Sequence, residues 1–315
     1  MEKDGKILKI LNNISFSIEK GEILGLSGES GCGKSMSALS IANLLPPQAA
    51  VTGGEIIYNG RDLTSLSGKE MRSLRGGEIS FIFQDVRQAL NPTMKAGKQI
   101  TEALELGGSR DKEKNKREAL EMLSSLGFNN PEKIFNGFPH QLSGGMCQRI
   151  MTAAAVIRRP KLLLGDEPSS SLDEESQKLC MSLLMKMNRE YKMSLLLISH
   201  DLSIIQKYCS RFLIMYGGRI VEEGPASSLF CAMHPYTQAL LNALPNKEKR
   251  GKKLENIPGK VPSPADQPPG CPFAPRCSKA EGVCGEAFPP EYYCGKGENG
   301  RRVYCYFPAA GSQNE

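Results

Sequence analysis

The 315-residue sequence predicts an α/β fold in which a glycine-rich loop adjoins a sheet that is buried on both faces. Three short runs are almost wholly apolar, as is typical of strands covered on both sides: Ile79–Phe83, Lys161–Gly165 and Ser194–Ser199. Helical patterns lie between these runs. Apolar residues make up 40% of the chain and charged residues 23%, so the chain can bury the sizeable core of an ordinary globular protein.

The N-terminal part is expected to form an antiparallel β portion. Residues 14–27 predict two short strands, Ile14–Ile18 and Glu22–Ser27, joined by a turn. The second strand leads directly into the glycine-rich loop, and a helix is predicted to follow from Lys34 to about Leu45, before two prolines.

The glycine-rich loop, Gly28-Glu-Ser-Gly-Cys-Gly-Lys-Ser35, fits the P-loop pattern between a strand and a helix. Its glycines let backbone amides converge on phosphates, which the helix N-terminus also favours. Lys34 is expected to reach the β- and γ-phosphates of ATP, and the Ser35 hydroxyl to ligate Mg²⁺. The residues expected to bind the nucleotide are Gly28, Ser30, Gly31, Cys32, Gly33, Lys34, Ser35 and Met36.

Between Val86 and Arg159 the pattern changes to helix, with Lys98–Leu106 and Lys114–Leu126 the clearest pieces. We therefore expect a helical subdomain over about residues 86–159, inserted into a nucleotide-binding domain over residues 1–230. Beyond about residue 230 the regular alternation fails and proline and glycine become frequent, which predicts a separate C-terminal extension over residues 231–315.

Two adjacent carboxylates end the second apolar run, in Leu162-Leu-Leu-Gly-Asp166-Glu167. Adjacent acids at a strand end are about as often ordinary solvated residues. Because a P-loop is also present, we interpret Asp166 as part of the magnesium shell and Glu167 as the base that polarises the attacking water.

Motifs along the chain, in the expected order, resemble those of the ABC ATPases. Leu142–Arg149 resembles the ABC signature and lies just before the acidic strand, while Gln84 looks like the Q-loop glutamine. Ser171-Leu172-Asp173 resembles the D-loop, and His200 the switch histidine. With the P-loop and the acidic strand, the resemblance covers about residues 6–308. It implies a P-loop NTPase (ABC ATPase) core with the N-terminal antiparallel β portion, a helical subdomain and a small Cys-rich C-terminal tail.

In the ABC ATPases two nucleotide-binding domains pack head to tail, so that the signature of one acts on the ATP held by the other. The resemblance implies that role for Ser143, Gly144, Gly145 and Met146, which would present a hydroxyl and backbone amides to the γ-phosphate. It also implies that the catalytic residues are Glu167, His200 and Gln84, that Mg²⁺ is bound by Ser35, Gln84 and Asp166, and that Asp173 belongs to the D-loop.

Several further stretches look like the ATPases of oligopeptide or dipeptide uptake: Phe83–Pro92, His234–Thr237, Ile257–Pro264 and Gly270–Cys277. This resemblance implies that ATP hydrolysis is coupled to peptide import. The implied partners are a second, non-identical ABC ATPase, two transmembrane permease subunits and an extracytoplasmic solute-binding protein. Two alternatives stay open, an importer ATPase for nickel or another metal chelate and a soluble ABC ATPase. The second lacks support, because the chain has neither tandem cassettes nor a long coiled-coil insertion.

The chain shows no apolar run of the roughly 18 residues that span a bilayer, and Met1–Lys9 lacks the apolar stretch of a secretion signal. We therefore expect it at the cytoplasmic face of the membrane, held there by the permease subunits. The net charge of +6 is not concentrated in one tract and gives little support to a nucleic-acid partner. Because Asp4–Ile10 contains no aromatic residue, we expect adenine to pack on an aliphatic residue such as Ile7 or Leu8, or on a group brought from elsewhere.

Five of the ten cysteines crowd into Cys271–Cys305, in a segment with few apolar residues of its own. They are spaced more widely than the ligands of most structural zinc sites. The resemblance to peptide-transporter ATPases implies a [4Fe–4S] cluster bound by Cys271, Cys277, Cys284 and Cys305, with Cys294 outside the matching pattern. Zinc and free thiols remain alternatives.

Overall fold

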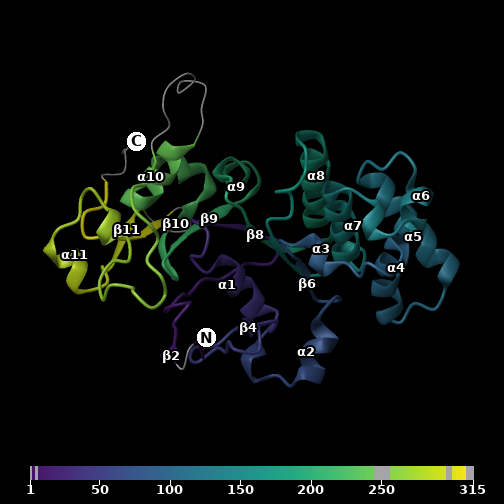
Figure 1. The fold of residues 1–315 in the computed structure, drawn as a ribbon, viewed down its shortest axis with the longest axis horizontal. Helices are drawn as coiled ribbons and strands as arrows, with labels where there is room; N and C mark the ends of the chain where they lie inside the picture. The colour runs from purple at the N-terminus through teal and green to yellow at the C-terminus, as the bar shows by residue number, and fades with distance from the viewer. Residues whose placement is uncertain (1, 4–5, 245–255, 296–299, 310–315) are drawn as a thin grey trace.

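The chain folds around one eight-stranded mixed sheet that is flanked by helices (Figure 1). A computed structural model describes residues 2–3, 6–244, 256–295 and 300–309. In spatial order the strands are β11 (Glu291–Cys294), β12 (Arg301–Tyr304), β10 (Arg219–Pro225), β9 (Arg211–Tyr216), β3 (Ile23–Ser27), β8 (Ser194–Ile198), β7 (Leu162–Asp166) and β6 (Ile79–Ile82).

Strands β9, β3, β8, β7 and β6 are parallel and form the buried half of the sheet. Every residue of β3, β7 and β8 is buried, as their apolar sequences predict for strands covered on both faces. The predicted strands Lys161–Gly165 and Ser194–Ser199 are thus confirmed as β7 and β8, and Ile79–Phe83 is confirmed as β6, although Phe81 is only half-buried and Phe83 lies beyond the strand. Because the carboxyl ends of parallel strands share one edge, the segments that follow β3, β6, β7 and β8 meet there.

The predicted strand Ile14–Ile18 is wrong. Both neighbours of β3 in the sheet are β8 and β9, so no edge of β3 is left for the segment that precedes it. Residues 14–18 instead run without strand pairing, with Ile14, Phe16 and Ile18 packed against the core. The N-terminal antiparallel portion consists of two small hairpins, β1 (Glu2–Lys3) with β2 (Lys6–Ile7), and β4 (Ile57–Tyr58) with β5 (Arg61–Asp62).

The antiparallel strands of the main sheet come from later in the chain. Strand β10 pairs with β9, and the hairpin of β11 and β12 continues the sheet, with Glu222 and Glu223 of β10 opposite Val303 and Arg302 of β12. The C-terminal extension therefore adds two strands to the cassette's own sheet, which its sequence did not predict.

The helices are α1 (Lys34–Ile41), α2 (Gly68–Leu74), α3 (Val86–Ala89), α4 (Ala96–Leu106), α5 (Lys112–Ser125), α6 (Pro131–Asn136), α7 (Gly144–Val156), α8 (Glu174–Tyr191), α9 (Leu202–Tyr208), α10 (Pro235–Ala243) and α11 (Gly282–Glu286). Helices α4 to α6 gather at one end of the molecule, and α10 and α11 lie at the other (Figure 1). The predicted helices over 98–106 and 114–126 are confirmed. Helix α1 ends at Ile41, earlier than predicted, because Asn43 adopts a left-handed conformation with φ of 49°.

The extension shares the hydrophobic core of the cassette. Tyr216 of β9, Tyr236 of α10 and Phe273 pack edge to face or tilted, with ring centroids 4.5–5.2 Å apart. Cys271 and Ile214 belong to the same buried cluster. This shared core explains how a segment with few apolar residues is held in place. In the described part of the chain, no helix is both long and apolar enough to cross a membrane.

Candidate functional site

The P-loop runs from β3 to α1 and depends on its glycines. Gly28 lies so close to the strand β9 that a Cβ there would stand 2.2 Å from the Met215 carbonyl oxygen. Gly33 caps α1 in a left-handed conformation, with φ of 107°, and a Cβ there would meet Leu11 at 2.6 Å. Both positions therefore require glycine, and no side chain at either position covers the backbone amides of the loop.

Lys34 is buried beneath this loop. Its ammonium donates hydrogen bonds to the carbonyl oxygens of Gly28, at 2.7 Å, and Glu29, at 3.0 Å. Burial raises the pKa of the neighbouring Cys32 thiol, which keeps that side chain uncharged beside the ammonium. Ser30 and Gly31 are exposed at the tip of the loop, and Met36 is half-buried in the first turn of α1.

The P-loop and the acidic strand meet through Ser35 and Asp166. The Ser35 hydroxyl lies beside the Asp166 carboxylate. Burial raises the pKa of Asp166, and the nearby Ser35 hydroxyl opposes the rise. A hydroxyl and a carboxylate side by side are hard oxygen donors that fit Mg²⁺. Gln84, the third predicted ligand, is exposed beyond the end of β6, the strand beside β7.

Glu167 and His200 face each other across the ends of β7 and β8. His200 Nδ1 lies 3.2 Å from Glu167 Oε1, and the Glu167 backbone N–H donates to the Ile198 carbonyl oxygen at 3.1 Å. Glu167 has φ of 51°, a conformation that costs on the order of 1–3 kcal/mol for such a residue and is concentrated at functional sites. Its side chain is 15% exposed, whereas that of His200 is 66% exposed.

A cavity of about 80 Å³ adjoins this pair, and its wall includes Ser199, Asp201 and Gln177. This volume holds water with ease, since a water needs roughly 10–15 Å³ on the same scale. A carboxylate on the wall of a small polar cavity is suited to accept a proton from a water there.

The signature residues lie at the open N-terminus of α7. Ser143 is exposed and caps the helix, its hydroxyl accepting from the Met146 backbone N–H at 3.2 Å. A Cβ on Gly144 would meet nothing within 4 Å, so this face of the helix end is free within the chain. Gly145 lies closer to its neighbours: a Cβ there would stand 3.4 Å from the Ser171 carbonyl oxygen and 3.4 Å from the Leu172 side chain.

Gln148 is a site residue to which sequence reasoning assigned no role. It is fully buried, its amide donates to the Pro168 carbonyl at 3.0 Å, and it accepts from the Ser171 hydroxyl at 3.1 Å. Gln148 thereby joins the signature helix to the loop that follows Glu167. The signal in the sequence was its place within the signature stretch Leu142–Arg149. Asp173, at the end of that loop, caps α8 through the Ser176 N–H at 2.9 Å.

The two candidates for packing on adenine differ in exposure. Ile7 ends β2 with 80% of its surface exposed, whereas Leu8 is half-buried. Ile7 therefore presents more apolar surface than Leu8, and the adenine platform stays a prediction.

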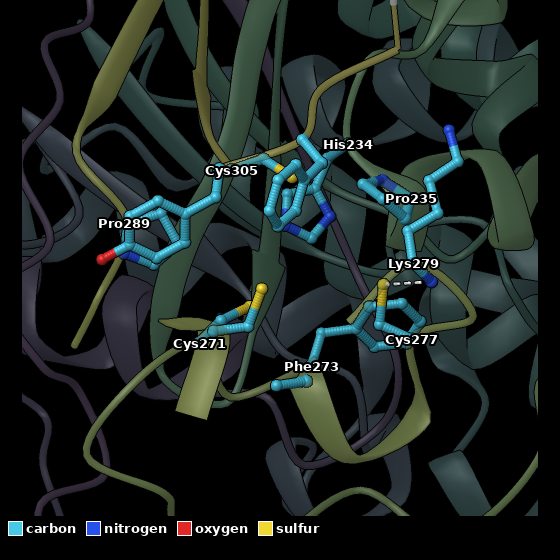
Figure 2. A pocket seen from close by; sticks show the side chains of 12 residues that line it. His234, Pro235, Cys271, Phe273, Cys277, Lys279, Pro289 and Cys305 are labelled. Carbon is cyan, nitrogen blue, oxygen red and sulfur yellow. Dashed lines mark hydrogen bonds between the residues drawn. The ribbon is translucent and has the colours of Figure 1, made fainter. Parts of the chain in front are cut away.

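Four cysteines of the extension line one pocket: Cys271, Cys277, Cys284 and Cys305. Figure 2 shows three of them around the space, together with His234 and Phe273. Burial raises the pKa of Cys271 to about 11, and repulsion from the Cys305 and Cys277 thiols contributes to the rise. Burial also raises the pKa of Cys277 and Cys305, so a cation would be needed to hold them as thiolates at neutral pH.

Among the described residues, no three metal-binding side chains converge closely enough to hold a single metal ion. The cavity between the thiols measures about 20 Å³. The backbone N–H of Lys279 donates to the Cys277 sulfur at 3.4 Å, a contact of the kind that tunes sulfur ligands. Cys294 lies in β11 and does not line this pocket.

Comparison with known proteins gives consistent matches. Residues 11–170 match the family model described as ABC transporter, and residues 221–284 match one described as oligopeptide/dipeptide transporter, C-terminal region. The probable peptide ABC transporter ATP-binding protein y4tR of Sinorhizobium fredii is 43% identical, over 90% of this chain and 85% of its own. The dipeptide transport ATP-binding protein DppD of Escherichia coli is 39% identical, over 95% of this chain and 91% of its own. A dimeric post-hydrolysis structure of the ATP-binding cassette MJ0796 with ADP and phosphate has a TM-score of 0.66 at 28% identity, covering 72% of this chain and 94% of that one.

Proposed function

The chain belongs to the ABC transporter ATPases, and from this premise we propose that it hydrolyses ATP to drive the uptake of dipeptides or oligopeptides. ATP hydrolysis is supported by one observation: at the carboxyl edge of the sheet the chain brings together Lys34, the Ser35–Asp166 pair and Glu167. The peptide part is supported by the match of residues 221–284 and by the names of the relatives. None of the relatives compared above is named for nickel.

Each residue of this edge has a distinct task. Lys34 and the loop amides bind the phosphates, Ser35 and Asp166 hold Mg²⁺ with Gln84, and Glu167 accepts the proton of the attacking water. Mg²⁺ bound with ATP neutralises phosphate charge and orients the phosphates for in-line attack. Because His200 touches Glu167, it orients that carboxylate and lies where a γ-phosphate would be sensed.

The open end of α7 supports a composite site. Ser143 is exposed, and the space next to Gly144 is open, so the hydroxyl and the backbone amides at this helix end are available to a nucleotide held by a second ATPase subunit. We propose that this partner is a non-identical ABC ATPase and that both sit on two permease subunits at the cytoplasmic face of the membrane, supplied by an extracytoplasmic solute-binding protein. The nucleotide-binding domain is residues 1–230 and the extension residues 231–315.

Reconstitution tests this function. The isolated chain is expected to hydrolyse ATP poorly, because the signature of a partner is missing, and to gain activity with the second ATPase and the permeases in proteoliposomes. Uptake of a labelled dipeptide should then require ATP, and a labelled nickel chelate should not be taken up. Full ATPase activity from a strictly monomeric preparation would contradict the composite site, and nickel uptake without peptide uptake would contradict the substrate.

We further propose that the cysteine pocket binds a [4Fe–4S] cluster. Such a cluster takes one thiolate on each iron, so its ligands surround it rather than converge on one point, which suits four separate thiols around one space. Because the cavity measures about 20 Å³, binding would spread the four side chains apart.

Metal analysis of the anaerobically purified chain tests this proposal. We expect brown protein with about four irons per chain. Cys277→Ser should lose the metal, whereas Cys294→Ser, which changes a cysteine of the same extension outside the pocket, should keep it. Colourless protein with zinc, or metal lost only in Cys294→Ser, would refute this ligand set.

A further inference from the structure

Glu29, the second residue of the P-loop, is held by side chains of the C-terminal extension. Its carboxylate receives two hydrogen bonds from the Arg276 guanidinium, with Nη1 2.5 Å from Oε2 and Nη2 3.1 Å from Oε1. Its backbone N–H donates to the Tyr236 hydroxyl at 2.7 Å. These contacts join residues that are 247 and 207 positions apart in the chain, so the extension is built onto the nucleotide loop itself.

The orientation of Arg276 is fully determined by its partners. Besides the two bonds to Glu29, Nη1 donates to the Tyr216 hydroxyl at 3.0 Å, Nε to the Pro258 carbonyl at 2.7 Å and Nη2 to the Ile257 carbonyl at 3.3 Å. A guanidinium has five N–H donors, and these five bonds use all of them. The side chain is only 5% exposed, so solvent competes little with this arrangement.

The ion pair between Arg276 and Glu29 neutralises a carboxylate that lies within the anion-binding P-loop. The Lys34 ammonium donates to the backbone carbonyl oxygen of Glu29 at 3.0 Å, while Arg276 pairs with the Glu29 carboxylate, so two cations contact this one residue. Without Arg276 the carboxylate would be unpaired, would repel the phosphates and would be free to pair with Lys34. Arg276 therefore keeps Lys34 available for the nucleotide.

The same arginine belongs to the turn that carries a pocket cysteine. Arg276 ends the short 3₁₀ turn Ala274–Arg276 and directly precedes Cys277, whose sulfur lines the cysteine pocket. The backbone N–H of Arg276 donates to the Phe273 carbonyl at 2.9 Å, and Phe273 is buried against Tyr216 and Tyr236. A shift of this turn would move the guanidinium from Glu29.

We propose that Arg276 is a positioning residue for ATP binding, which holds the P-loop through Glu29 and couples the nucleotide site to the cysteine-bearing turn. The proposal rests on the proposed function only in taking ATP as the ligand of the P-loop. Coupling between two sites is reciprocal, so an ordered turn tightens ATP binding and bound ATP stabilises the turn by the same factor.

Nucleotide titration of the full chain tests whether Arg276 positions the P-loop for ATP binding. Arg276→Gln is expected to weaken ATP binding about tenfold, within the usual range for coupled sites. Adding Glu29→Gln should restore most of the affinity, because it removes the unpaired carboxylate, whereas a merely structural role of Arg276 would not be rescued in this way. Arg302→Gln is the matched control, since Arg302 is an arginine of the same extension that pairs with Glu223 of β10 and Glu291 of β11 rather than with the P-loop, and this variant should bind ATP like the wild type.

Hydrogen exchange on the wild-type chain tests the coupling between the nucleotide site and the cysteine-bearing turn, and it does not depend on the folding of a variant. ATP is expected to slow amide exchange in residues 273–277 and to leave β11 unchanged. Unchanged exchange in residues 273–277 with ATP bound would overturn the coupling, as would wild-type affinity in folded Arg276→Gln. Failure of the wild type to bind ATP at all would instead count against the proposed function.

Discussion

Replacing Glu167 with glutamine is expected to slow ATP turnover in the assembled transporter at least about a hundredfold while ATP remains bound. Glutamine matches the size of glutamate and keeps a partner for His200, but it cannot accept a proton from water. Asp201 also lines the cavity beside Glu167, but its carboxylate already accepts a hydrogen bond from the Ser203 N–H at the start of α9, at 2.8 Å. Steady-state phosphate release and equilibrium ATP binding measure the two effects separately.

Glu174→Gln provides the control for this variant. Glu174 lies seven positions further along the chain, at the start of α8, and forms an exposed ion pair with Lys178 at 2.6 Å. Exposed pairs of this kind contribute little, roughly 0–1 kcal/mol, so turnover should stay at the wild-type level. Wild-type turnover in Glu167→Gln would remove Glu167 from the role of base.

The features that the sequence predicts correctly are those encoded by neighbouring residues. A short, mostly apolar run such as Leu162-Leu-Leu-Gly165 is enough to indicate a strand such as β7, and the spacing of Gly28, Gly33 and Lys34 is enough to indicate a phosphate-binding loop. Parallel strands then place Asp166, Glu167 and the P-loop at one edge, because they lie at the carboxyl ends of β7 and β3, which are separated only by the parallel strand β8.

Features that depend on distant pairing were not predictable in the same way. The segment Ile14–Ile18 alternates like a strand, yet both edges of β3 are taken by strands that lie about 170–190 positions later in the chain. The pairing of β12 with β10 and the bonds between Arg276 and Glu29 likewise have no local signature. Because charged residues are mostly exposed, the sequence alone predicts a solvated arginine in this proline-rich segment, and only the tertiary structure shows its contact with the P-loop.

Replacing Lys34 with alanine is expected to weaken ATP binding about ten- to hundredfold, because a charge-assisted hydrogen bond is typically worth about 1.5–3 kcal/mol. Lys34 is buried, its ammonium donates to the carbonyl oxygens of Gly28 and Glu29, and its charge acts to lower the pKa of Asp166, so alanine removes the cation that these groups face. The effect should appear in the isolated chain, since the P-loop acts on its own nucleotide. Titration with ATP measures it.

Gly145→Asp separates binding from hydrolysis and serves as the counterpart of Lys34→Ala. A Cβ at Gly145 would stand 3.4 Å from its nearest neighbours, so a side chain can be accommodated with small shifts. Its carboxylate would repel a γ-phosphate held by the partner subunit. The isolated Gly145→Asp chain should therefore bind ATP with wild-type affinity, whereas the assembled transporter should lose turnover. Wild-type ATP affinity in Lys34→Ala, or weakened binding in isolated Gly145→Asp, would contradict this division of labour between the P-loop of one subunit and the signature of the other.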